Sequence, residues 1–183
     1  MNINYQNILT GGNILGISGI DAQVHSFTPL VDSTTAVHAA ITLPTTGTTA
    51  VTTAITVPNV ARNLSVTGNA ATAVGNVVIV GTDITNAVIT ETIVANGTAT
   101  VLGTKLFKTV TSITVPTRGA ASDTISIGTG KTFALPVHLP DDTVFRVTQN
   151  KVSIAYTTSV TTNSVTLTPT ITGDVVNVYF LLY

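Results

Sequence analysis

The 183-residue chain is poor in charge, because Asp, Glu, Lys and Arg make up 8% of it where about 25% is usual. A formal net charge of -1 and scattered basic residues exclude the clustered Lys and Arg that bind nucleic acid. The lack of cysteine excludes disulfides and thiolate metal sites. The sequence has no run of about 18 apolar residues that would predict a membrane span.

The composition predicts an all-β fold. Hydrophobic residues make up 44% of the chain, and threonine and valine are the two commonest residue types. Both are β-branched, which favours a pleated strand over a helix. Because a freely diffusing protein usually carries more surface charge than this chain can supply, we expect an assembled protein.

Residues 1–32 differ from the rest of the chain. Bulky apolar residues are interspersed with glycines between residues 8 and 20, and glycine makes such a segment costly to order by itself. The pattern predicts either an N-terminal arm that lies on a neighbouring molecule or a terminal strand on its own domain. We therefore predict two parts, an arm over 1–32 and a β-body over 33–183.

Strand patterns recur at intervals of roughly 8 to 12 residues from about residue 34, which is typical of sandwiches and barrels. We predict strands over 51–57, 63–67, 77–80, 87–95, 106–115 and 124–127. The continuous apolar run 77–80 predicts a strand buried on both faces. The expected fold is an antiparallel β-sandwich, or a related barrel, with an extended N-terminal arm. No fixed-period repeat supports the alternative of an ice-binding solenoid.

The C-terminal residues 140–183 predict a meander within the body. Alternating segments 152–160 and 165–171 precede the apolar segment 175–183, and 143–148 is a further strand. Turn residues separate these segments, so each is expected to pair with the next. The last segment is apolar on both faces and is expected in the core or under another subunit.

The stretch ISIGTGKT over 125–132 resembles the end of a phosphate-binding loop. That loop needs a first glycine at the position of Ile125 and a helix after the lysine. Pro136 and Pro140 forbid that helix. We therefore predict a glycine-bearing turn in which Lys131 is solvated, and no nucleotide.

Other polar residues lack the grouping that catalysis or metal binding needs. His25, His38 and His138 are far apart, and the pair Asp141–Asp142 follows a proline, as expected for a solvated turn. Glu91 could form a cross-strand ion pair with Lys105 or Lys108; a Lys–Asn crosslink promoted by Glu91 is the sharper alternative. We predict no catalytic, cofactor or metal site and no enzymatic activity.

One block carries a resemblance. It comprises VPNVARNLSVTG (57–68), IVGTDITNAVITETIVANGTATVLGTKLFKTVTSITVP (79–116) and DTISIGTGKTFALP (123–136). Its matching elements are Pro58 with Arg62-Asn63, Gly81-Thr82-Asp83, Thr90 to Ile93, Gly103 to Ile113 and the closing Gly-x-Gly before Leu135-Pro136. Together these resemble a segment found in structural proteins of tailed bacteriophages.

The resemblance implies a non-enzymatic β-sandwich subunit of the virion. Among virion roles it favours a head decoration or cement protein that binds the major capsid protein on the capsid exterior and stabilises the shell. Such a subunit is expected to form a homo-oligomer, with a trimer favoured. It is expected to bind neither nucleic acid nor a membrane. The alternatives are a tail, baseplate or fibre component, or a host-surface adhesin that binds carbohydrate.

Overall fold

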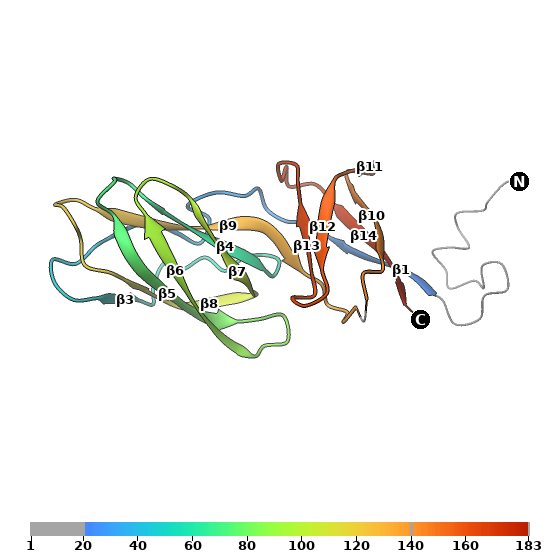
Figure 1. Ribbon diagram of the computed structural model, residues 1–183, viewed down its shortest axis with the longest axis horizontal. Coiled ribbons are helices and arrows are strands. Elements are labelled where there is room, and N and C mark those ends of the chain that lie inside the picture. Colours follow the sequence, from blue (N-terminus) through green and yellow to red (C-terminus); the bar gives the residue numbers. More distant parts are fainter. Residues whose placement is uncertain (1–20, 140, 183) are drawn as a thin grey trace, which may run out of the picture. The chain divides into compact units, whose positions relative to one another are not determined.

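A computed structural model describes residues 21–139 and 141–182 (Figure 1). Within these residues the secondary structure is β-strand throughout, with no helix that could span a membrane. The strands are β1 (Asp21–Phe27), β2 (His38–Thr42), β3 (Thr49–Val51), β4 (Arg62–Gly68), β5 (Val74–Thr82), β6 (Val88–Asn96), β7 (Val101–Phe107), β8 (Thr109–Val115), β9 (Thr124–Ala134), β10 (Val144–Gln149), β11 (Val152–Ser153), β12 (Tyr156–Ser159), β13 (Ser164–Leu167) and β14 (Val176–Leu182).

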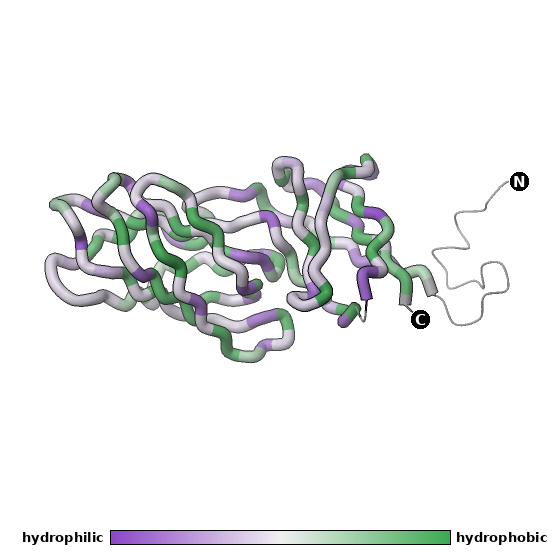
Figure 2. The backbone as a smooth tube through the Cα atoms, viewed as in Figure 1, coloured by the Kyte–Doolittle hydropathy of each residue, from purple (hydrophilic) through white to green (hydrophobic). Residues whose placement is uncertain are grey.

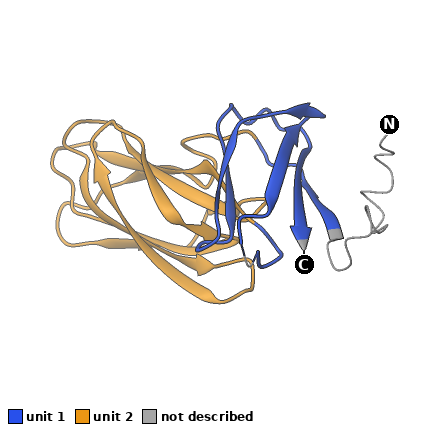
Figure 3. Cartoon of the chain, turned by 45° about the vertical axis from the view of Figure 1, so that its right-hand side comes forward, with its two compact units in different colours: residues 1–30, 135–183 blue, residues 31–134 orange. Residues whose placement is uncertain are grey.

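The chain forms two compact units, coloured separately in Figure 3. One comprises Val31–Ala134; the other combines Met1–Leu30 with Leu135–Tyr183. This division differs from the predicted arm over 1–32 and body over 33–183. Residues 21–27 form β1, which pairs with the last strand of its own chain, and residues 1–20 of the predicted arm lie outside the described part.

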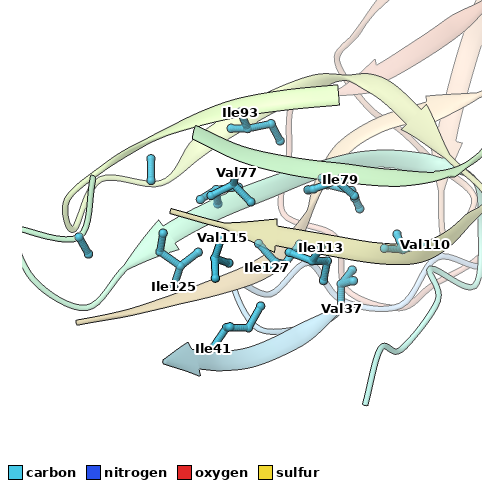
Figure 4. Close-up of a cluster of buried hydrophobic side chains, with 14 of the residues drawn as sticks. Val37, Ile41, Val77, Ile79, Ile93, Val110, Ile113, Val115, Ile125 and Ile127 are labelled. Carbon is cyan, nitrogen blue, oxygen red and sulfur yellow. The ribbon is translucent and has the colours of Figure 1, made fainter. Parts of the chain in front are cut away.

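The Val31–Ala134 unit, called the central unit below, is an antiparallel sandwich. One sheet has the order β2-β9-β4-β7 and the other has the order β3-β8-β5-β6. A large buried cluster draws side chains from both sheets, and Figure 4 shows part of it, including Val77, Ile79, Ile113 and Ile127. The predicted all-β sandwich is confirmed.

Strand β5 shows how side-chain alternation builds this core. Val77 and Ile79 are fully buried, whereas Val78 and Val80 are only half-buried. Successive side chains of a strand point to opposite faces, so the second pair lies on the outer face of the sheet. The prediction that 77–80 is buried on both faces was therefore wrong.

Several predicted boundaries also differ from the observed ones. Of the predicted strand 51–57 only Val51 lies in a strand, the end of β3, and Ile55 packs against the core outside any strand. The predicted strand 106–115 is divided at Lys108 into β7 and β8, which belong to different sheets. A change of sheet within one apolar run leaves no periodic signal, because both halves alternate correctly.

The second unit, called the terminal unit below, has a sheet of order β1-β14-β10-β11 and a hairpin of β12 and β13. The predicted meander was wrong in its last pairing. Strand β14 pairs with β1 on one side and with β10 on the other. An apolar strand buries more surface between two neighbouring strands than at the edge of a sheet. The residue pattern of β14 cannot predict that its partner is β1, because β1 lies at the other end of the chain.

Candidate functional site

The most elaborate polar cluster of the central unit surrounds Glu91, where the edge strands β6 and β7 of the two sheets approach each other. Glu91 lies on β6 and is 9% exposed. Its Oε1 accepts hydrogen bonds from the backbone N–H of Thr104 at 2.6 Å and of Lys105 at 3.1 Å, and from the Thr104 hydroxyl at 3.1 Å. The carboxylate therefore satisfies N–H groups of the β7 edge.

Gly103 gives the carboxylate room for this approach. A Cβ atom at this position would lie 2.5 Å from Oε2 of Glu91 and 2.8 Å from the Ile93 side chain. Oε2 itself is buried and accepts no hydrogen bond among the described residues. Oε1 of Glu91 therefore accepts the N–H groups of the β7 edge, whereas Oε2 is enclosed without a hydrogen bond from a described residue.

The predicted ion pair between Glu91 and a lysine does not form in the described structure. Lys105 Nζ donates instead to the carbonyl of Thr90 on β6 at 2.7 Å, and Lys108 Nζ donates to Oδ1 of Asn86 at 2.8 Å. Glu91 and Lys105 therefore exchange bonds with each other's strand backbones. The contact between Lys108 and Asn86 is an exposed hydrogen bond, and the hydrogen bonds of Glu91 go to Thr104 and Lys105 instead.

A second buried polar group is Arg62, which sequence reasoning did not single out as a site residue. It is 1% exposed, its Nε donates to the carbonyl of Gly130 at 2.7 Å, and Nη2 donates to the same oxygen. The guanidinium lies 4.7 Å from the ring centroid of Phe133. Burial lowers the pKa of Arg62 to about 10, against the opposing charge of Asp32, so the group remains a cation at neutral pH.

The GTGKT stretch is part of strand β9, and the predicted turn was wrong. Gly128 and Gly130 both lie inside the strand and neither is among the glycines with positive φ. They allow close approach: a Cβ at Gly128 would lie 2.1 Å from the Ser33 carbonyl oxygen, and one at Gly130 would lie 2.4 Å from Oδ1 of Asn63. Lys131 is half-buried on the same strand. No phosphate-binding loop forms.

Two aspartates organise turns of the central unit. Asp83 Oδ1 accepts from the N–H and hydroxyl of Thr85 and from the N–H of Ala87. The Asp123 carboxylate accepts from the Thr72 hydroxyl and from two backbone N–H groups. The hydrogen bond from Thr85 is the main cause that lowers the pKa of Asp83.

The histidines and the acidic pair make local contacts. His38 contacts the carbonyl of Ala39, and His138 is exposed. His25 lies with its ring centroid 5.4 Å from that of Phe27, and burial lowers its pKa. The carboxylate of Asp142 accepts from the Thr158 hydroxyl. Among the described residues no three His, Asp or Glu side chains are grouped to hold a metal ion.

An exposed aromatic cluster on the terminal unit was missed by sequence reasoning. A register shift in β10 between Val144 and Arg146 leaves both Phe145 and Arg146 exposed. The rings of Phe145 and Tyr179 have centroids 6.2 Å apart, and the Arg146 guanidinium lies 5.8 Å from the Tyr179 ring. Phe145 is 49% exposed. A bulge re-aims a side chain and leaves no distinctive residue type in the sequence.

The other aromatic residues of the C-terminal strands have separate roles. Phe180 is buried, and the hydroxyl of half-buried Tyr156 donates to the carbonyl of Val144 at 3.2 Å. Burial and then the charge of Asp142 raise the pKa of Tyr156. Tyr183 lies outside the described residues.

The chain was compared with known proteins at three levels. No family model, no curated protein and no solved structure matches it.

Proposed function

We propose that the chain is a non-enzymatic structural subunit of a tailed-bacteriophage particle, which binds the major capsid protein on the capsid exterior and braces the shell. The observation that carries the proposal is what the buried polar groups do. Among the described residues the buried charged side chains are Arg62, Glu91 and Asp123. Each makes hydrogen bonds to backbone groups of a strand or a turn.

The phage-like block supports the same proposal. Its matching residues are those with architectural contacts: Arg62 and Asn63 bind neighbouring backbone, Asp83 organises a turn, and the closing glycines allow close packing within β9. The residues of the block therefore stabilise the sandwich fold, and none of these contacts points to a chemical reaction. Decoration of a lattice needs such a subunit, because many identical contacts of modest strength add up over a shell.

The test is to image particles that carry the protein and particles from which it has been deleted, by electron cryo-microscopy. We expect density that disappears from the outer capsid surface and shells that open at a lower temperature. Density confined to the tail would contradict the decoration role. Deletion of residues 2–20 leaves β1 intact, so loss of particle binding by this variant would assign the attachment to that segment.

A carbohydrate-binding module of the host-recognition apparatus is a second candidate, favoured by the exposed cluster of Phe145, Tyr179 and Arg146. Aromatic faces stack on sugar rings, and a polar partner beside them fixes orientation. Binding of the purified chain to a glycan array, lost in Phe145→Ala and retained in Leu102→Ala, would support this role. Leu102 is a suitable control because it is 57% exposed on β7 of the central unit.

A further inference from the structure

The outer face of the sheet β3-β8-β5-β6 carries no charged side chain. The four strands contain one charged residue, Glu91, and it is buried on the core side. The outward residues form cross-strand rows fixed by the register. One row is Ala50, Thr114, Val78 and Thr92, and the next is Ser112, Val80 and Thr90.

This face also exposes large apolar side chains on β5 and on the edge strand β6. Val88 is 76% exposed and Val94 is 59% exposed on β6, and Val74 is 47% exposed on β5. Figure 2 shows the apolar run in the middle of β5 in green. A solvated sheet face normally alternates hydrophobic residues on the core side with polar and charged residues on the outside. Here valine, threonine, serine, alanine and asparagine take the outside positions, and none of them is charged.

We infer that this face is a self-association surface on which a second copy of the chain packs through the same face. A two-fold contact needs a self-complementary surface, and an uncharged sheet face meets its own copy without burying an unpaired charge. β-Branched side chains of two such faces can interdigitate at the roughly 10 Å separation of stacked sheets. The inference does not depend on the phage role.

The area of the face sets the strength of the contact. With about 4.8 Å between strands and about 3.3 Å per residue, the four strands present roughly 450 Å² in projection. Two copies would therefore bury roughly 900 Å², close to the about 1,000 Å² at which specific interfaces begin. A dimer of this size forms in a concentration-dependent way and gains strength when a shared scaffold holds many copies close together.

Sedimentation velocity of the full chain, from about 1 µM to about 1 mM, tests the inference. The variant carries two substitutions, Val88→Lys and Val94→Lys, which place four lysines in each dimer interface. Both positions are more than half exposed in the single chain, so folding is retained and circular dichroism checks it. We expect the dissociation constant to rise at least tenfold.

The matched control is Val152→Lys, a valine that is 66% exposed on β11 of the terminal unit. It should sediment as the unsubstituted chain does. The inference is overturned if the unsubstituted chain remains monomeric over the whole range or if the double-lysine variant associates as before. It is equally overturned if Val152→Lys weakens association as much as the double substitution.

Discussion

At the residue scale, several glycines allow two segments of backbone to approach closely, and this packing role explains them better than chemical reactivity does. Gly128 is the clearest case, because the space beside it is filled by backbone, which cannot rotate away. The added methyl group of alanine would meet the Ser33 oxygen at 2.1 Å and the Thr34 Cα at 2.5 Å. The sequence stretch that looks most like a ligand site is thus a packing site within a strand.

Gly128→Ala should therefore lower the free energy of unfolding by about 3 kcal/mol, the upper end of the usual cost of overpacking. Gly47→Ala is the matched control. It meets no atom within 4 Å and bears only the cost of a left-handed backbone, roughly 1 kcal/mol. Urea denaturation of both variants gives the comparison. Equal loss in the two would show that the segment containing Ser33 and Thr34 moves aside freely.

Asp123 makes a pH-dependent contribution at the same scale. Burial raises its pKa, but hydrogen bonds from Ala120 N–H, the Thr72 hydroxyl and Gly119 N–H, together with the charge of Arg118, lower it by more. The net pKa is below the ordinary 3.8, so the folded chain favours the carboxylate. This stabilisation is fully present above about pH 4 and is lost as the pH falls through the folded-state pKa.

The variant Asp123→Asn should accordingly be less stable than the unsubstituted chain at pH 7, and the difference should shrink as the pH falls to about 3. Urea midpoints measured at several pH values would check this. A difference that is constant with pH would mean that the carboxylate charge has no part in holding the turn.

At the element scale, the exposed margins of the sheets are closed by side chains. The Glu91 carboxylate covers two N–H groups of β7, Lys105 Nζ covers a carbonyl of β6, and the Tyr156 hydroxyl covers a carbonyl of β10. Unpaired edge groups are templates for pairing with another chain. Glu91 and Lys105, two of the few charged residues, therefore cover edge groups that could otherwise pair with another chain.

Glu91→Ala should lower the free energy of unfolding by about 1–3 kcal/mol, because it leaves the N–H groups of Thr104 and Lys105 without their acceptor. Glu91→Gln keeps an acceptor oxygen and should lose less. Thr92→Ala, the neighbouring outward position, should stay within about 0.5 kcal/mol. Chemical denaturation and light scattering would measure stability and aggregation; a Glu91→Ala variant as stable as Thr92→Ala would refute the capping role.

The sequence allowed prediction of the strands far better than of their partners. Alternation located β4, β6 and the start of β9, because burial on one face imposes a period of two on the residues themselves. It could not show that β14 pairs with β1, or that the chain changes sheets at Lys108. These features depend on residues far away in the chain. The side-chain contacts of Arg62 and Phe145 were missed for the same reason.

At the scale of the whole molecule, the two units differ in how they are encoded. The central unit is continuous and contains every member of the large buried cluster. The terminal unit is assembled from both ends of the chain, and β14 depends on β1 for one of its two neighbours. We therefore expect the central unit to fold as an isolated fragment and the C-terminal part of the terminal unit to need β1.

A fragment of residues 31–134 should fold cooperatively, with dispersed amide resonances in a proton–nitrogen spectrum. A fragment of residues 135–183 should not, because it lacks β1 and is close to the size below which a core seldom suffices. Adding a peptide of residues 21–30 to the second fragment should induce strand signal in circular dichroism. A folded 135–183 fragment would show that β1 is dispensable.

Because β1 pairs with β14, the two strands of this pair are synthesised at different times. The Ser26 hydroxyl donates to Asn177 Oδ1 across a separation of 151 residues, so β1 leaves the ribosome long before its partner exists. The central unit is complete by Ala134 and can fold while translation continues, since domains generally fold as they emerge. During that interval the backbone groups of β1 have no strand partner, and they become paired only after β14 has been synthesised.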